Sequence, residues 1–319
     1  MPIGVGTWAW GNQVLWGYQS DQDPTLEATF ARAVALGLRF FDTADSYGTG
    51  RLQGRSEALL GRFRHALPPQ QQDQLLVATK LAPFPWRLGR QGLRRAFEAS
   101  RQRLGGRLER VQLHWSTQRY APWQEGPLVD GLADLVQEGA VASLGLSNVG
   151  PQRLRQLHRQ LQQRGVAIAS LQVQLSLLAP EAIAPGGVAE VCQELGIDLI
   201  AYSPLALGLL GRRVADQGPA AAVSGPRRLL FARLQPRLAP LLDCLDAMAR
   251  DRDVPPAAVA LNWCRSHGAM PIVGLRSVAQ AEAAAAAQHW QLEGGEREAL
   301  DAAAMALPVR MPANPFVSD

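Results

Sequence analysis

The stretch FFDTADSYG, residues 40–48, links an apolar run to a polar loop that carries Tyr47. An apolar run that ends in Asp42 is typical of a buried parallel strand, and the residues after it are typical of a loop. Lys80 ends the next apolar run along the chain, and His114 ends the one after that. In a parallel sheet such ends share one edge, so we expect these polar side chains to meet there.

Eight apolar runs of this kind alternate with amphipathic stretches. The runs span residues 3–8, 38–42, 75–80, 110–114, 141–147, 168–172, 197–203 and 271–274. The intervening stretches, such as residues 128–138 and 151–164, carry apolar residues at i, i+3 and i+4, as helices on a sheet do. The pattern predicts an α/β protein with a (β/α)8 TIM barrel, formed as a single domain by residues 1–319. The longest interval holds a Gly/Pro-rich segment, for which we expect a loop over the active face at about 211–228.

Composition narrows the class of protein. The 319 residues are 47% hydrophobic and 19% charged, enough apolar material for a large core. The net charge of +4 is carried by scattered arginines, so we expect no nucleic-acid partner. No apolar run has membrane-spanning length, and the first residues lack the features of a signal peptide. Three distant cysteines favour a cytoplasmic protein without a metal site, and both a monomer and a homo-oligomer stay open.

Lys80 is the only lysine among the 32 basic Lys and Arg residues. On a solvated surface either cation serves, so a preference for arginine explains the other 31 positions but not this one. Lysine is a compact charge whose pKa shifts on burial, whereas arginine keeps its proton and is a wide planar group. The composition therefore marks Lys80 as a candidate functional residue.

These motifs resemble the aldo-keto reductases, in the branch that includes potassium-channel β subunits. The resemblance is strongest to uncharacterised aldo-keto reductases of cyanobacteria and chloroplasts, through GTWAWGNQ at 6–13, DSYGTGRL at 45–52 and LHWS at 113–116. It implies an enzyme, an NADPH-dependent oxidoreductase that reduces an aldehyde or ketone to the alcohol. It also implies a catalytic tetrad, whose positions here are Asp42, Tyr47, Lys80 and His114.

The chemistry of the four side chains agrees with that assignment. Carbonyl reduction places negative charge on oxygen as hydride reaches carbon, so a proton donor must stand close by. Tyr47 is the expected donor. We expect the Lys80 ammonium to lower the pKa of Tyr47, Asp42 to anchor Lys80, and His114 to orient the substrate carbonyl.

The resemblance also implies a set of cofactor contacts. Ser147, Asn148 and Gln172 match partners of the nicotinamide carboxamide, although helix capping is an alternative role for the first two. Tyr202 matches the aromatic residue on which the nicotinamide ring stacks. The complete set is Trp8, Asp42, Ser147, Asn148, Gln172, Tyr202, Ser203, Leu205, Gly208, Arg276, Ser277 and Gln280.

The remaining cofactor positions concern its phosphates and its adenine. Ser203, Leu205 and Gly208 are expected beside the pyrophosphate, where loop backbone groups approach an anion closely. Arg276 and Ser277 open the last barrel helix and suit a 2′-phosphate, which favours NADPH over NADH. Relatives often carry Glu-Asn at the positions of Ala283 and Ala284, so adenine is expected to be held more weakly. The family's N-terminal hairpin is missing before residue 3, which predicts an open barrel bottom or a truncated start.

Aromatic residues near the active face suggest a substrate class. Trp8, Tyr47, Trp86, His114 and Trp115 are the expected pocket residues, with Tyr120 beside them. Such a pocket would favour flat aldehydes such as pyridoxal or aryl aldehydes, although packing accounts for each residue equally well.

Two other functions were compared with this reading. The sequence argues against a Rossmann dehydrogenase, because the loose glycine match at residues 4–9 follows no strand and has no acidic residue about 20 residues on at a strand end. A regulatory subunit that binds NADPH and senses redox state, with little turnover, would keep the same tetrad. Only turnover on a small-molecule carbonyl substrate separates the latter from an enzyme.

Overall fold

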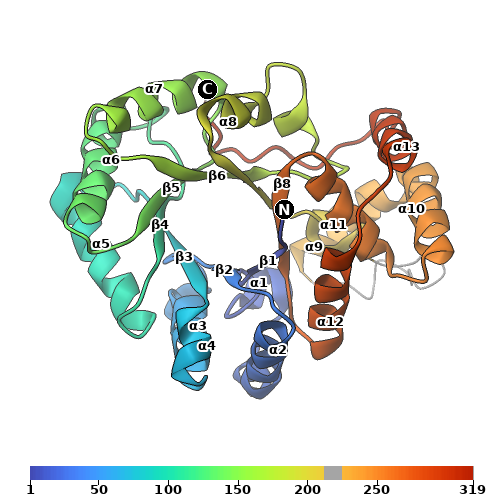
Figure 1. The fold of residues 1–319 in the computed structure, drawn as a ribbon, viewed down its shortest axis with the longest axis horizontal. Coiled ribbons are helices and arrows are strands. Elements are labelled where there is room, and N and C mark those ends of the chain that lie inside the picture. The colour runs from blue at the N-terminus through green and yellow to red at the C-terminus, as the bar shows by residue number, and fades with distance from the viewer. Residues whose placement is uncertain (212–224, 319) are drawn as a thin grey trace.

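Eight parallel strands close into a barrel, in the order β1 to β8. The structure, a computed structural model, describes residues 1–211 and 225–318. The strands are β1 (Gly4–Gly6), β2 (Phe40–Asp42), β3 (Leu76–Leu81), β4 (Arg110–Leu113), β5 (Ser143–Ser147), β6 (Ile168–Gln174), β7 (Asp198–Tyr202) and β8 (Ala269–Gly274). β1 pairs with both β2 and β8, which closes the ring, so the predicted (β/α)8 barrel is confirmed (Figure 1).

The larger helices surround the barrel and follow the strands in sequence. They are α2 (Asp23–Ala35), α3 (Arg55–His65), α4 (Pro69–Asp73), α5 (Gly89–Arg103), α6 (Pro122–Gln137), α7 (Pro151–Gln162), α8 (Val188–Leu195), α9 (Pro226–Leu234), α10 (Ala239–Asp251), α11 (Pro256–Ser266), α12 (Val278–Ala286) and α13 (Gly294–Met305). The short helix α1 (Gln13–Trp16) follows β1. In Figure 1, α10 and α13 lie together on one side of the barrel.

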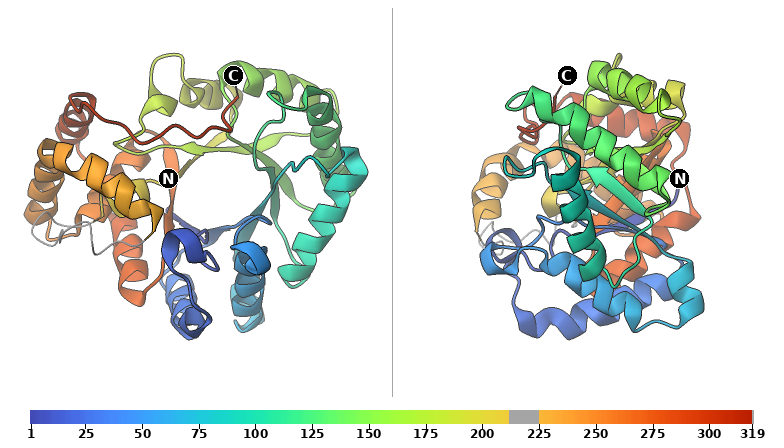
Figure 2. Two further views of the ribbon diagram at one scale, coloured as in Figure 1. Left: turned by 180° about the vertical axis from the view of Figure 1, so that it is seen from behind. Right: turned by 90° about the vertical axis from the view of Figure 1, so that its left-hand side faces the viewer.

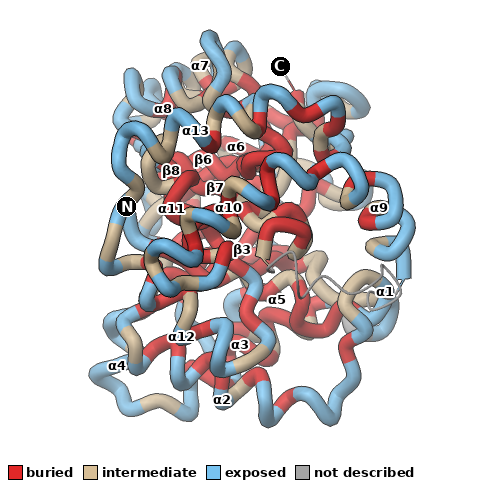
Figure 3. The backbone as a smooth tube through the Cα atoms, turned by 90° about the vertical axis from the view of Figure 1, so that its right-hand side faces the viewer, coloured by how far each residue is buried: buried red, intermediate tan, exposed pale blue. Residues whose placement is uncertain are grey.

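Helix α7 shows why the amphipathic stretches become helices. It begins at Pro151, where the fixed backbone of proline fits a first helical turn and its missing N–H leaves no bond unmade. Leu154, Leu157 and Leu161 recur at three- and four-residue spacing, and all three are buried. Burial of each such side chain contributes about 1.5–3 kcal/mol. Figure 3 shows the same division between buried inner positions and exposed outer turns.

A small apolar cluster fills the lower barrel interior. Phe40, Ile200 and Met270 are buried there with two further residues, Ala78 and Ile272. The Arg110 guanidinium lies 6.0 Å from the centroid of the Phe40 ring. The lower interior of the barrel is thus packed with side chains.

The segment expected as a loop at 211–228 divides into two parts. Residues 212–224 lie outside the described residues. The last residues of the expected loop are helical instead, since α9 begins at Pro226. Gly225 precedes it with φ of 67°, a conformation that favours glycine, and proline at the first helical position then starts the helix.

The residues after α13 form an irregular segment that returns to the barrel mouth. Figure 2 shows it running from α13 across the end of the barrel to the C-terminus. Met311 N donates to the Leu178 carbonyl at 2.8 Å, and Ser318 forms a bridge with Val149 just beyond β5. We call residues 311–318 the C-terminal strap.

Candidate active site

A buried ion pair lies at the base of the barrel mouth. Asp42 is the last residue of β2, and Lys80 lies near the end of the adjacent strand β3. Each is only 1% exposed, and the Lys80 ammonium donates to Asp42 Oδ2. Lys80 Nζ also donates to the Thr43 carbonyl at 3.0 Å. Two charges removed from water need this kind of mutual neutralisation and hydrogen bonding.

Two glutamine side chains donate hydrogen bonds to the second carboxylate oxygen of Asp42. Gln112 Nε2 donates to Asp42 Oδ1 at 3.0 Å, and Gln172 Nε2 donates to the same atom at 2.8 Å. Gln172 was expected at the nicotinamide, and it does line the cleft, while its side-chain amide nitrogen donates to the Asp42 carboxylate. Gln112 was missed. Its signal is the two-residue period of a strand, which places it on the same inward face as His114.

Tyr47 lies directly over the ion pair. Lys80 Nζ is 4.9 Å from the centroid of the Tyr47 ring. Burial lowers the pKa of Lys80, and Asp42 opposes this fall. Burial first, and then the Asp42 and Asp45 carboxylates, raise the pKa of Tyr47 well above 10.0. This direction is opposite to the expected lowering by Lys80, because burial disfavours the phenolate and the two carboxylates add to the rise.

His114 faces Tyr47 across the mouth and is held in the neutral form. The centroids of the two rings are 5.8 Å apart, with the edge of one toward the face of the other. Burial, followed by the positive charges of Lys80 and Arg87, lowers the pKa of His114 well below 6.5. The Ser46 hydroxyl lies 3.3 Å from His114 Nδ1. Ser46 was not predicted, although it stands within the motif FFDTADSYG at residues 40–48.

Asp45 fixes the loop beneath Tyr47. It is 2% exposed, pairs with Arg87 and accepts a hydrogen bond from the Ala82 amide at 3.1 Å. Burial raises the pKa of Asp45 to about 6, and Arg87 opposes the rise. The pair joins the loop after β2 to the loop after β3, so it positions the segment that carries Tyr47.

The expected nicotinamide residues are connected by hydrogen bonds. Tyr202 Oη donates to Asn148 Oδ1 at 2.9 Å, while Asn148 Nδ2 donates to Ser147 Oγ at 3.1 Å and to the His114 carbonyl at 3.0 Å. All four residues line the cleft. The N-cap of α7 is Gly150 and has no side-chain cap, so Ser147 and Asn148 do not serve as its cap.

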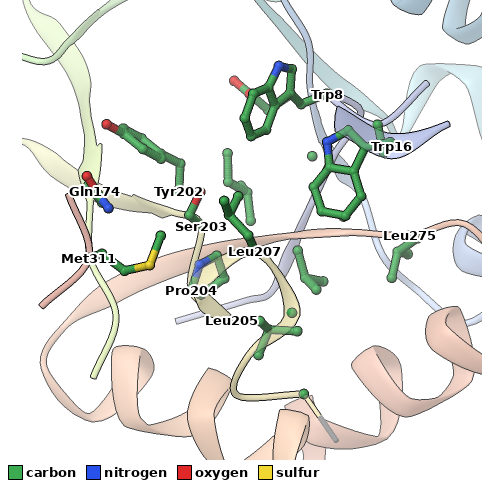
Figure 4. Close-up of a pocket in the computed structure, with 18 of the residues that line it drawn as sticks. Trp8, Trp16, Gln174, Tyr202, Ser203, Pro204, Leu205, Leu207, Leu275 and Met311 are labelled. Atoms are coloured by element: carbon green, nitrogen blue, oxygen red, sulfur yellow. The ribbon is translucent and has the colours of Figure 1, made fainter. Parts of the chain in front are cut away.

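The loop after β7 holds several non-glycine residues in the left-handed region. Ser203, Ala206 and Leu207 have φ of 52°, 47° and 58°. Such conformations cost about 1–3 kcal/mol each and are concentrated at ligand clamps. Ser203, Leu205 and Gly208 all line the cleft, as Figure 4 shows for the first two.

Two guanidiniums lie over an aromatic ring at the far end of the cleft. Arg227 is 4.0 Å and Arg276 is 5.2 Å from the centroid of Trp16. Both arginines line the cleft, together with Gln280 and the adjacent pair Ala283 and Ala284. Ser277 has a different position: it is the N-cap of α12, accepts from the Gln280 amide, and is not among the lining residues. Arg227 and Trp16 were not predicted.

The cleft that joins these groups has a volume of about 820 Å³, within the usual range for ligand pockets. Trp8, Tyr47, His114 and Trp115 line it, as expected. In Figure 4, Trp8 and Trp16 stand opposite Tyr202 and Met311. Trp86 does not line the cleft; it is 71% exposed and stacks on Phe84 with ring centroids 4.7 Å apart.

The local geometry explains the positions of two rim aromatics. Arg87 turns inward to Asp45, so its neighbour Trp86 points to the rim. Tyr120 lies beside the cleft and accepts a hydrogen bond from Trp115 Nε1 at 2.9 Å. The rim therefore braces Trp115, while Trp86 stays in solvent.

The C-terminal strap contributes residues that sequence reasoning missed. Met311 to Phe316 line the cleft, and Phe316 stacks on Trp115 with ring centroids 4.5 Å apart. Asn314 Nδ2 donates to Tyr202 Oη at 2.7 Å and to Asn148 Oδ1 at 3.0 Å. The strap has neither helical nor strand periodicity, so no sequence pattern places it at the mouth.

The described residues contain neither a metal-binding cluster nor a membrane-spanning helix. Within residues 1–211 and 225–318, no three His, Cys, Asp or Glu side chains are grouped so that they could hold a metal ion. Over the same residues, no helix combines the length and the apolar character needed to cross a membrane.

Comparison with solved structures gives the same architecture. An aldo-keto reductase from Klebsiella pneumoniae, solved in complex with NADPH, superposes with a TM-score of 0.71 at 25% identity, covering 99% of this chain and 94% of that one. The thermostable aldo-keto reductase Tm1743, solved with the inhibitor epalrestat, gives a TM-score of 0.73 at 20% identity and 95% coverage of both chains. At that identity the second likeness concerns the fold alone.

Comparison with curated proteins gives more similar sequences. A chloroplastic pyridoxal reductase of Arabidopsis thaliana is 45% identical over 99% of this chain and 86% of its own length. An uncharacterised oxidoreductase of Mycobacterium bovis is 35% identical over 95% and 89%. Residues 2–304 match the aldo/keto reductase family. This chain therefore belongs to the aldo/keto reductase family.

Proposed function

We propose that this protein is an NADPH-dependent enzyme that reduces an aldehyde or ketone to the corresponding alcohol. The observation that carries the proposal is the ion pair of Lys80 and Asp42, buried beneath Tyr47 and beside a neutral His114. Burial of a lysine costs free energy, which a functional role would explain. Side chains with shifted pKa values that gather in a cleft are typical of catalytic sites.

The residues of the cleft fit NADPH. At one end, Ser147, Asn148 and Gln172 offer amide and hydroxyl groups, and the Tyr202 ring offers a face for stacking. At the other end, Arg227 and Arg276 supply positive charge where phosphates would lie, and arginine binds phosphate strongly. Trp16 Nε1 is buried there without a partner among the described residues. The two ends match the amide and the phosphates of one dinucleotide.

When bound, NADPH supplies the hydride that is added to the carbonyl carbon. Tyr47 donates its phenolic proton to the carbonyl oxygen, which completes the alcohol. The raised pKa of Tyr47 keeps that proton in place at neutral pH. Lys80 stabilises the phenolate as it forms, and Asp42 holds Lys80.

His114 acts on the substrate oxygen as a neutral hydrogen-bond donor. Since its pKa is lowered, the ring keeps one N–H at neutral pH. If the Ser46 hydroxyl donates to Nδ1, that proton is on Nε2, where it can orient the carbonyl. We propose that this tautomer is the active one.

We propose flat aldehydes, pyridoxal among them, as the substrate class. Trp8, Trp115 and Phe316 give the cleft aromatic walls, which suit a planar ring. The name of the Arabidopsis relative supports the same choice for this chain.

The test is turnover on a panel of carbonyls. We expect steady NADPH oxidation with pyridoxal and aryl aldehydes, and slower oxidation with short aliphatic aldehydes of similar reactivity. Tight NADPH binding without turnover on any carbonyl would contradict the enzyme assignment. Equal rates on aromatic and aliphatic aldehydes would contradict the substrate class alone.

We also propose that the chain folds as one domain in a reducing compartment. Cys192 and Cys264 are buried free thiols, and burial raises the pKa of Cys192 to about 12. A single cooperative unfolding transition would support one domain.

The name of the Arabidopsis relative places that protein in the chloroplast. The cytoplasm is the location expected for this chain from its sequence. Imaging of a tagged chain in its own cell would distinguish the two locations.

A further inference from the structure

The side-chain amide nitrogen of Asn314, in the C-terminal strap, donates to two residues of the nicotinamide end. One hydrogen bond goes to Tyr202 Oη at 2.7 Å and the other to Asn148 Oδ1 at 3.0 Å. Tyr202 Oη donates to that same Asn148 oxygen at 2.9 Å. The three polar groups therefore form a closed triangle that a residue distant in sequence completes.

The triangle fixes the orientation of the Asn148 amide. A carboxamide can be turned so that its oxygen and nitrogen exchange places, and only its partners decide between the two. Two donors, from Asn314 and Tyr202, converge on Oδ1, so Nδ2 must face the other way. There it donates to Ser147 Oγ and to the His114 carbonyl.

The strap also holds the backbone of Asn148. This residue has φ of 58°, a left-handed conformation that costs free energy and persists only where the surroundings enforce it. Its carbonyl accepts from Ser318 N at 3.3 Å, and Gly150 N donates to the Ser318 carbonyl at 2.5 Å. The strap therefore holds Asn148 both through the side chain of Asn314 and through the backbone of Ser318.

We propose that Asn314 is a positioning residue of the cofactor site. It acts through Asn148 and Tyr202, holding the amide and the phenol in the orientation that receives the nicotinamide end of NADPH. The inference rests on the proposed NADPH site, but it concerns binding and does not require turnover.

The strap offers a variant that separates positioning from folding. Asn314 Oδ1 accepts from the Phe316 amide at 2.9 Å, which makes a local turn. Asn314→Asp keeps that acceptor but loses both donated hydrogen bonds, whereas Asn314→Ala loses all three. If the turn alone matters, the Asp variant behaves like the wild type. If positioning matters, both variants are impaired.

The measurement is the Kd of NADPH, followed by fluorescence titration of the wild type and both variants. We expect each variant to weaken binding about tenfold, the effect of losing two neutral hydrogen bonds. The matched control is Asn262→Ala. Asn262 is buried outside the cleft and also donates two hydrogen bonds, to the carbonyls of Ala258 and Ala287. The control should lower Tm and leave the Kd unchanged.

A double-mutant cycle tests the route. Tyr202→Phe keeps the ring but removes the hydroxyl that forms one corner of the triangle. If Asn314 acts through this group, adding Asn314→Ala to Tyr202→Phe should weaken NADPH binding by less than the sum of the two effects. Additive effects on Kd, a wild-type Kd in Asn314→Ala, or a wild-type Kd in Asn314→Asp would overturn the proposal. Absence of turnover with an intact Kd pattern would overturn only the proposed reaction.

Discussion

The Lys80 ammonium lies 4.9 Å from the centroid of the Tyr47 ring, with Asp42 bound to its other side. In the proposed reaction Tyr47 therefore donates the proton, and Lys80 stabilises the negative charge that remains on Tyr47. Tyr47→Phe keeps the ring and removes the hydroxyl that carries the proton. We expect kcat to fall about 10²- to 10⁴-fold, the usual contribution of a general acid, with no change in the Kd of NADPH. Unchanged turnover in this variant would eliminate Tyr47 as the donor.

Lys80→Arg keeps the positive charge and should still disable reduction. The guanidinium is wide and planar, and it cannot occupy the compact site between Asp42 and the Thr43 carbonyl while facing Tyr47. The kcat with an aryl aldehyde is the measurement, and activity close to that of the wild type would show that charge alone suffices.

Removing the charge of Lys80 separates stability from activity. Lys80→Met leaves the Asp42 carboxylate buried without its cation, which should cost about 3–5 kcal/mol in the free energy of unfolding. The pair Asp42→Asn with Lys80→Met removes both charges and should recover much of that loss while staying inactive. Denaturant unfolding of the wild type and both variants measures this, and a double variant as unstable as the single one would contradict the ion-pair account.

The gathering of Asp42, Lys80 and His114 at one rim could be predicted from the sequence, because these residues end consecutive strands. Asp42, Lys80 and His114 each follow an apolar run, and parallel strands bring such ends to one rim. The eight strands could be predicted for the same reason, since fully buried parallel strands are continuous apolar runs. At these positions the apolar runs in the sequence coincide with the strands of the barrel.

The strap could not be predicted, because residues 311–318 have no periodicity and are placed only by tertiary contacts. Trp86 and Ser277 show a related limit: their neighbours in sequence line the site or brace it, but one side chain points to solvent and the other caps a helix. A position in a motif fixes the backbone more firmly than the direction of each side chain.

His114 predicts one part of the pH dependence of stability. Its folded pKa lies well below the ordinary value of 6.5, so below pH 6.5 the unfolded chain binds the proton more readily. The folded state must therefore lose stability as pH falls below about 6.5. In His114→Gln this loss should be smaller, as measured by Tm between pH 7 and pH 5. Parallel Tm curves for variant and wild type would contradict a neutral buried His114.

The raised pKa of Asp45 predicts a pH dependence of stability with the opposite sign. Its folded pKa, about 6, is above the ordinary 3.8, so between these values the folded state holds a proton that the unfolded chain has released. Its contribution to stability therefore falls as pH rises from about 4 to about 6. Asp45→Asn removes this contribution, and its Tm should rise more over that range than the Tm of the wild type. An equal rise in both proteins would show that Asp45 titrates normally.

Arg276 predicts the choice between the two nicotinamide cofactors. It lines the cleft beside Trp16, where a 2′-phosphate would meet its charge. Arg276→Ala should raise the KM for NADPH about tenfold and leave the KM for NADH unchanged. Arg94→Ala, which removes an exposed ion pair between Arg94 on α5 and Glu138 at the end of α6, is the matched control. Equal losses with both cofactors would assign Arg276 to a shared phosphate.

The only lysine of the chain is 1% exposed and bound to Asp42. No ε-amine is therefore presented at the surface, where arginine carries the positive charge. Aldehydes such as pyridoxal condense with primary amines to give imines, a reaction for which a guanidinium is a poor nucleophile. For the aldehydes proposed as substrates, the surface therefore offers no lysine for adduct formation, and we expect no lysine adduct in the mass spectrum of the folded protein after prolonged exposure to pyridoxal.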